Sequence, residues 1–114
     1  MGKRIIQQAR GKGSLTYRVR PRAYRYRIIY PSLNINGASK IIKLFNSSGH
    51  TSPLVKIQTE KNENEKLFFI VPAADGIYEG KEVYLGKRPE NKISEIGDIL
   101  MLKDIPAGTK VFNV

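Results

Sequence analysis

The stretch LVKIQTEKNENEKLFFIVP, residues 54–72, contains the clearest structural pattern in the chain. Two runs rich in β-branched and aromatic residues, 54–59 and 67–71, flank a polar turn at 61–65. Such runs favour β-strands, and a short polar turn between them predicts a hairpin. Val55 and Ile57 lie two residues apart, so they would share one face of the first strand.

Further strand candidates surround this hairpin and are bounded by proline, glycine or Asn-Ser turns. They are residues 25–30, 40–45 and 81–85, with 99–102 and 109–112 as weaker candidates. About five principal strands, with turn signals about every ten residues, predict an all-β fold. The best match is a small five-stranded Greek-key OB-like barrel, and an SH3-like barrel is the second choice. The expected core is Ile28, Ile42, Leu44, Val55, Ile57, Phe69, Val71 and Val83. Single helical turns are expected near residues 3–9 and at 90–96.

Length and composition exclude several classes of protein. The 114 residues suffice for one domain, and the absence of cysteine excludes disulfide scaffolds and thiol catalysis. The longest apolar run, 67–71, is too short for a membrane helix, and the N-terminus lacks the apolar core of a signal peptide. We therefore expect a cytoplasmic protein without a membrane partner.

The charge is distributed unevenly along the chain. The net charge is +10, yet the first acidic residue is Glu60. Residues 1–59 contain twelve basic and no acidic residues, whereas residues 60–114 contain eight basic and ten acidic residues. This asymmetry indicates a polyanionic partner, most often a nucleic acid.

Residues 1–24 are expected to form a basic RNA-binding arm in front of a barrel domain at 25–114. Gly11, Gly13 and Pro21 interrupt helices, and the arm has too few apolar residues to fold alone. Arg18, Arg20 and Arg22 are spaced by two, so an extended chain would present them on one side.

Arginine suits phosphate by bidentate geometry, and interleaved tyrosines can stack on unpaired bases. The alternatives are a solubilising tail and a membrane-surface polycation. Residues 1–27 contain seven Arg, two Lys and no acid, which favours RNA. The predicted RNA-binding residues are Lys3, Arg4, Gln8, Arg10, Lys12, Ser14, Tyr17, Arg18, Arg20, Arg22, Tyr24, Arg25, Arg27, Lys40, Lys43 and His50.

Two further predictions concern the residues of this set that lie beyond residue 27. Lys40, Lys43 and Lys56 form a second basic patch, in which each lysine is either a phosphate contact or an ordinary surface residue. Lys40 and Lys43 have opposite parity, so we expect them on opposite sides of a strand. His50 is the only histidine and lies in a polar loop, which favours a hydrogen-bonding role, with possible RNA contact, over catalysis or metal binding.

No pattern in the sequence indicates an enzyme. A phosphate-binding loop followed by Lys-Ser/Thr is absent, and the carboxylates at 60, 63 and 65 lie in a lysine-rich turn. A nuclease would need a carboxylate cluster beside a base. We therefore expect no catalytic residue, no metal, no cofactor and no small-molecule substrate.

Four stretches, in order, resemble one protein family. They are MGKRIIQQARGKGS (1–14), GHTSPLVKI (49–57), LFFIVPAADGIYEG (67–80), and GDIL (97–100) followed by IPAGTKVFNV (105–114). Together they resemble the N-terminal half of the universal L-two protein of the large ribosomal subunit, in its archaeal form. Met101 departs from the family pattern, in which proline is common at this position.

The resemblance implies an OB-like barrel, with the family's SH3-like barrel following after Val114. It also implies a ribosome-bound, non-catalytic protein that binds large-subunit ribosomal RNA beside neighbouring ribosomal proteins. Its implied role is to organise the peptidyl-transferase region and to support subunit association. The alternative is a free single-stranded RNA-binding module of OB or cold-shock type, or a translation factor.

Overall fold

The computed structural model describes residues 2–32, 34–89 and 93–114. The arm contains α1 (Ile6–Gly11) and two 3₁₀ turns, η1 (Leu15–Tyr17) and η2 (Pro21–Tyr24). The rest contains β1 (Gly37–Phe45), β2 (Leu54–Asn62), β3 (Glu65–Pro72), β4 (Glu82–Gly86), β5 (Ile99–Leu100) and the 3₁₀ turn η3 (Leu102–Asp104). None of the helices in these described ranges is long and apolar enough to cross a membrane.

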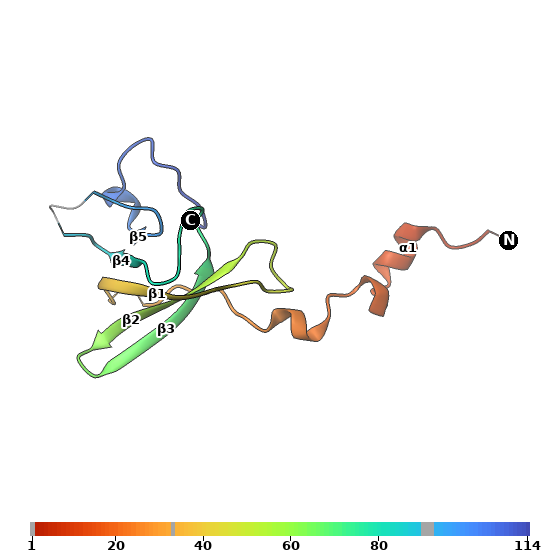
Figure 1. The fold of residues 1–114 in the computed structure, drawn as a ribbon. Helices are drawn as coiled ribbons and strands as arrows, with labels where there is room; N and C mark the ends of the chain where they lie inside the picture. The colour runs from red at the N-terminus through yellow and green to blue at the C-terminus, as the bar shows by residue number, and fades with distance from the viewer. Residues whose placement is uncertain (1, 33, 90–92) are drawn as a thin grey trace.

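The five strands form one sheet in the order β3-β2-β1-β4-β5 (Figure 1). β1, β2 and β3 are consecutive antiparallel neighbours, and β4 returns to pair with β1. This order is that of a Greek key. β5 adds to β4 in parallel, so β3 and β5 form the two sheet edges and the barrel is open between them. The predicted all-β, five-stranded, barrel-like fold is confirmed.

Five of the predicted strands lie where β1 to β5 are found, but the strand predicted at 25–30 is wrong. That segment makes one backbone contact with the sheet edge, from Ile29 N–H to the carbonyl of Ile70 at 3.3 Å. Pro31 follows directly and has no N–H to extend a ladder. β5 takes the place of this strand as the fifth member of the sheet.

Three smaller predictions also change. Residues 109–112 form no strand, and their end is held instead by Asn113, which bonds to Tyr30. The helical turn expected at 3–9 is found at Ile6–Gly11, so it is shifted toward the C-terminus. Residues 90–92 of the turn expected at 90–96 lie outside the described residues, and residues 93–95 form no helix.

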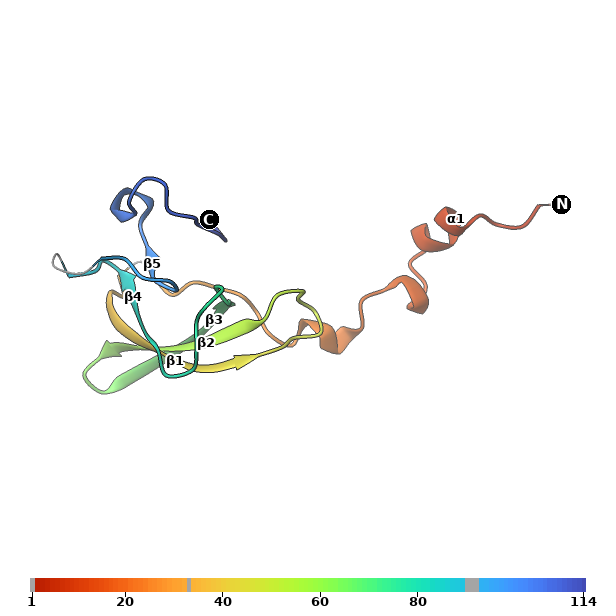
Figure 2. The ribbon, with the colours of Figure 1, turned by 45° about the horizontal axis from the view of Figure 1, so that its top comes forward.

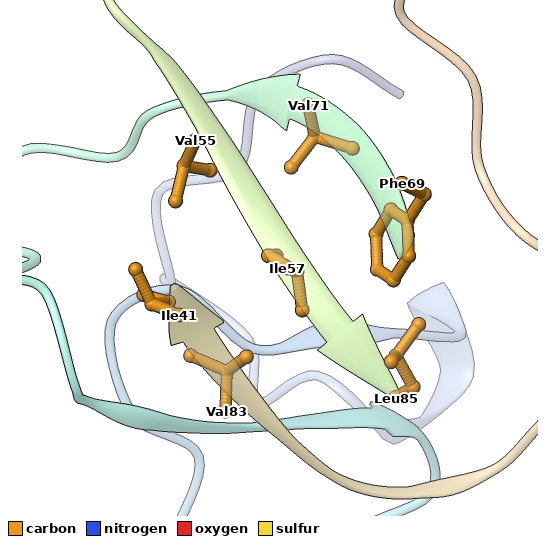
Figure 3. Packing of buried hydrophobic residues seen from close by; sticks show 7 residues of the cluster. All are labelled: Ile41, Val55, Ile57, Phe69, Val71, Val83 and Leu85. Atoms are coloured by element: carbon orange, nitrogen blue, oxygen red, sulfur yellow. The ribbon is translucent and has the colours of Figure 1, made fainter. Parts of the chain in front are cut away.

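The core lies on the inner face of the sheet. Its seven members are each at most 5% exposed and converge from four strands (Figure 3): Ile41, Val55, Ile57, Phe69, Val71, Val83 and Leu85. Five of the eight predicted core residues belong to this cluster, namely Val55, Ile57, Phe69, Val71 and Val83. Leu44 packs against its margin, Ile28 is half-buried, and Ile42 is 39% exposed, so Ile42 is not a core residue.

A β-bulge explains why Ile41 and not Ile42 is buried. The register of β1 against β2 shifts between Ile41, which faces Ile57, and Lys43, which faces Lys56. Ile42 is therefore an extra residue on β1. The alternation predicted from the sequence breaks at this residue, and Ile41 takes the inward position.

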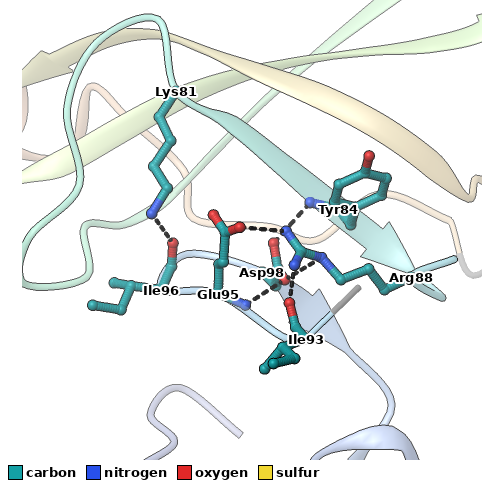
Figure 4. Close-up of polar contacts among 7 residues, drawn as sticks. All are labelled: Lys81, Tyr84, Arg88, Ile93, Glu95, Ile96 and Asp98. Carbon is teal, nitrogen blue, oxygen red and sulfur yellow. Dashed lines mark hydrogen bonds and ion pairs between the residues drawn. The ribbon is translucent and has the colours of Figure 1, made fainter. Parts of the chain in front are cut away.

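The loop that leads from β4 to β5 is held by a buried charge cluster around Arg88 (Figure 4). Arg88 pairs with Asp98 at 3.1 Å and with Glu95 at 3.5 Å, and its guanidinium lies 4.7 Å from the centre of the Tyr84 ring. Its guanidinium also donates to the carbonyl of Ile93. Asp98 in turn accepts bonds from the backbone N–H groups of Tyr84 and Glu95. These contacts fix β5 beside β4.

Arg88→Lys is expected to lower the free energy of unfolding by about 1–2 kcal/mol, measured by urea denaturation. A lysine can bond one carboxylate but cannot pair with both and stack on Tyr84. Lys61→Met is the matched control, because the Lys61–Glu65 pair is exposed on both sides, at 51% and 59%. Its loss is expected to change stability by less than about 1 kcal/mol. Equal effects of the two variants would contradict a stabilising role for the Arg88 cluster.

Candidate nucleic-acid interface

The N-terminal arm extends away from the sheet. Figures 1 and 2 both show it leaving beside the loop between β1 and β2, with the N-terminus far from the strands. The molecule measures 73 × 37 × 25 Å and has a radius of gyration of 19.2 Å. A compact domain of this length would have a radius of gyration of about 13 Å. The arm is therefore a projection, available to a partner from most directions.

Short turns give the arm its local shape. Gln8 caps α1, since its side-chain oxygen accepts a bond from the Ile5 N–H at 3.3 Å. Gly13 adopts φ +64°, a left-handed turn that favours glycine. Arg18 and Arg20 are extended, but Arg22 lies within η2. The predicted alternation of arginines therefore ends at Pro21.

The basic residues of the arm, and Arg25 and Arg27 just after it, are exposed and have no acidic partner in the part of the chain that the structure describes. Among the described residues, no carboxylate lies within 4.0 Å of any of them. Arg25 lies over the Tyr26 ring, 5.8 Å from its centre. The exposed members of this set are Lys3, Arg4, Arg10, Lys12, Arg18, Arg20, Arg22, Arg25 and Arg27. Positive charge without internal compensation favours an anionic partner.

The other predicted residues of the arm differ in their secondary structure and in the contacts that they already make. Ser14 and Tyr17 are exposed, Tyr17 at 41%, and lie at the start and the end of the η1 turn. Gln8 is exposed, but its side-chain oxygen is already used in the cap of α1. Tyr24 is the last residue of η2.

Three contacts anchor the base of the arm to the sheet domain. The Tyr26 ring packs on Phe45, with ring centres 4.7 Å apart and a 55° tilt. Ile29 bonds to the β3 edge, as described above. The Tyr30 hydroxyl donates to the carbonyl of Asn113 at 2.9 Å and accepts from its side-chain amide at 2.8 Å. The arm therefore starts from a fixed point on the domain.

Three of the predicted residues, Lys40, Lys43 and His50, lie on the sheet domain. Lys40 and Lys43 are exposed on β1, and the bulge places them on the same face, which corrects the prediction of opposite sides. Lys40 faces Gln58 and Lys43 faces Lys56, and the last two share a face because they are two residues apart.

His50 supports the loop between β1 and β2. It is half-buried, and its Nδ1 lies 3.1 Å from the Ser47 hydroxyl. Its backbone N–H donates to the Ser47 carbonyl, also at 3.1 Å. These bonds fit the predicted hydrogen-bonding role in the loop.

Phe68 was not among the residues predicted from the sequence, although it lies on the same face of the sheet as Lys40 and Lys43. Phe68 is 48% exposed, whereas its neighbour Phe69 is in the core. The alternation of a strand, once Phe69 is placed inside, puts Phe68 outside. No group of three or more His, Cys, Asp or Glu side chains that could hold a metal ion is found within the described ranges.

Comparison with known proteins finds archaeal proteins of the large ribosomal subunit among the relatives of this chain. The whole chain is 38% identical to the large ribosomal subunit protein uL2 of Hyperthermus butylicus and covers 45% of it. It is 36% identical to the uL2 of Pyrobaculum aerophilum and 34% identical to that of Picrophilus torridus, covering 44% and 45% of them. No protein-family model matches the chain. The chain thus spans a little under half the length of the curated relatives it matches, and the resemblance expected from the sequence is confirmed.

Proposed function

Because the whole chain is similar to part of the archaeal uL2 proteins, we propose that it is a structural, non-catalytic component of the large ribosomal subunit that binds large-subunit ribosomal RNA. The observation that carries this proposal is the arm, whose basic residues are exposed and unpaired with any described carboxylate. The names of the relatives support ribosomal RNA as the polyanion of this proposal.

In this proposal the two parts of the chain have different tasks. Residues 25–114 form a rigid platform, and residues 1–24 form the arm that contacts RNA. The anchors at Tyr26, Ile29 and Tyr30 fix where the arm begins. Arginine guanidinium groups then bind phosphates where RNA strands lie close together, and the arm becomes ordered as they bind. Within a ribosome, neighbouring proteins would contact the same region, and the RNA so held would include the peptidyl-transferase region and support subunit association.

Salt dependence of binding tests this proposal. If roughly 6–10 phosphate contacts form, affinity for large-subunit RNA should fall about 10³–10⁵-fold between 50 and 200 mM salt. Each phosphate-contacting arginine replaced by alanine should reduce the slope by about one unit. Filter-binding or anisotropy titrations across this salt range measure both quantities. An affinity that does not change with salt would contradict the proposal.

One observation favours the alternative, a free single-stranded RNA-binding module or translation factor. Such modules place aromatic side chains on the barrel face, and Phe68 is exposed there. Sedimentation separates the two functions. A ribosomal component stays with the large subunit through a high-salt wash, whereas a factor is released.

A further inference from the structure

We propose that the outer face of β1, β2 and β3 is a second RNA site, which holds an unpaired nucleotide with its base on Phe68 and its phosphates on lysines. This outer sheet face comprises Lys40, Lys43, Lys56, Gln58 and Phe68. The inference rests on the proposed binding of RNA, but its residues are separate from the arm.

The strand register assembles this face from two rows. In one row Lys40, Gln58 and Phe68 lie side by side across the three strands. In the next row Lys43, Lys56 and Ile70 do the same. The β1 bulge is essential, because without it Lys40 and Lys43 would point to opposite sides.

Two of the three lysines on this face, Lys43 and Lys56, face each other across the sheet. Lys43 lies directly opposite Lys56, and like charges in that position destabilise a sheet. Lys40 lies opposite Glu82 of β4 on one side and Gln58 of β2 on the other, and Glu60 on β2 is opposite Lys66. The row of Lys43, Lys56 and Ile70 contains no carboxylate. A bound anion would remove the repulsion between Lys43 and Lys56.

Phe68 indicates which anion fits. Its ring is half-exposed, and the Lys56 ammonium lies 4.7 Å from the ring centre. The cation lies over the ring, so a positive charge and an exposed aromatic surface meet at one place. A nucleotide offers a base for the ring and a phosphate for the lysine, whereas an acidic peptide offers only the charge. The pairing favours single-stranded RNA over an acidic protein surface.

The outer sheet face also adjoins the arm. The row beyond Lys43 and Lys56 contains Phe45, Leu54 and Pro72. Leu54 and Lys56 are two residues apart, so this row belongs to the same face. Tyr26, at the base of the arm, packs on Phe45. An RNA strand held by the arm can therefore continue onto the lysine rows.

The test compares Phe68→Leu and Phe68→Tyr in the full chain, titrated with a short single-stranded oligoadenylate. Phe68→Leu should weaken binding about tenfold or more, because it removes the stacking surface, and Phe68→Tyr should retain it. Tyr78→Leu is the matched control. Tyr78 is also exposed, at 62%, with Lys81 6.0 Å from its ring centre, but it adjoins Glu79 and should not bind RNA.

Heparin and poly-glutamate serve as anions without bases. Phe68→Leu should bind heparin as the parent does, whereas Lys43→Ala with Lys56→Ala should bind both heparin and oligoadenylate more weakly. The inference is overturned if Phe68→Leu keeps the parent affinity for oligoadenylate. It is also overturned if Phe68→Leu loses heparin and oligoadenylate equally, or if poly-glutamate binds as tightly as oligoadenylate.

The same titrations in an Arg18→Ala, Arg20→Ala, Arg22→Ala background separate this site from the arm. Phe68→Leu should weaken binding by the same factor there. If the arm variants bind normally while Phe68→Leu does not, the proposed role of the arm fails and the outer sheet face stands.

Discussion

A chain without residues 1–24 is expected to bind large-subunit ribosomal RNA on the order of 10³-fold more weakly than the whole chain, at a fixed salt of about 0.1 M. The deletion removes seven basic residues. All seven are exposed and none is paired with a described carboxylate, so each is free to release a counterion from a phosphate. Titration of the RNA with both chains at one salt concentration measures the effect.

The same deletion should leave the thermal melting temperature nearly unchanged. The anchors at Tyr26, Ile29 and Tyr30 remain. Among the removed residues whose exposure the structure describes, only the small side chain of Ala23 is buried, at 7% exposure, so little packing is lost. Lys103→Ala with Lys110→Ala is the control, because these exposed lysines lie far along the chain from the arm. Affinity equal to that of the parent after the deletion would refute the division between platform and arm.

The second large effect is expected in the core. Ile41→Ala should lower the free energy of unfolding by about 2–5 kcal/mol, because it opens a cavity among packed side chains. Ile42→Ala removes the same atoms one residue later, where the side chain is 39% exposed, and should lower it by less than about 1 kcal/mol. Urea denaturation of the two variants measures the difference.

This pair of substitutions is its own control, since chemistry and strand are the same and only the face differs. Because the bulge at Ile41 and Lys43 decides that face, the pair tests the register directly. A larger loss for Ile42→Ala than for Ile41→Ala would mean that the strand follows simple alternation, with Lys40 and Lys43 on opposite sides.

Simple alternation was sufficient to predict the hairpin. Val55, Ile57, Phe69 and Val71 are apolar at every second position, and all four are in the core. Turn residues set the ends of the strands, so their order along the chain was also predictable. Local propensity and burial agree throughout this segment, which is why the sequence is easy to interpret there.

Long-range pairing was not predictable from local patterns. Residues 25–30 are as β-branched and aromatic as a strand, yet they make one bond to the β3 edge and no ladder. The bulge at Ile42 likewise depends on how β1 meets β2. Both outcomes are decided by a partner strand distant in sequence, about which local propensity contains no information.

One part of the candidate site could likewise be predicted from the sequence, and the other part could not. The arm was evident from charge alone, because twelve basic residues precede the first acid. The lysines of the outer sheet face could be grouped from the sequence, but their shared face and the position of Phe68 beside them could not, because these residues come from three strands and are joined only by register. A surface built across a sheet needs the fold before it can be identified.

Hydrogen exchange of the whole chain, with and without large-subunit ribosomal RNA, tests the central claim most directly. Backbone amides of residues 2–22 should exchange rapidly in the free protein and become protected on RNA, while protection in β1 to β4 stays the same. Arm amides that still exchange rapidly in the RNA-bound protein would contradict the account.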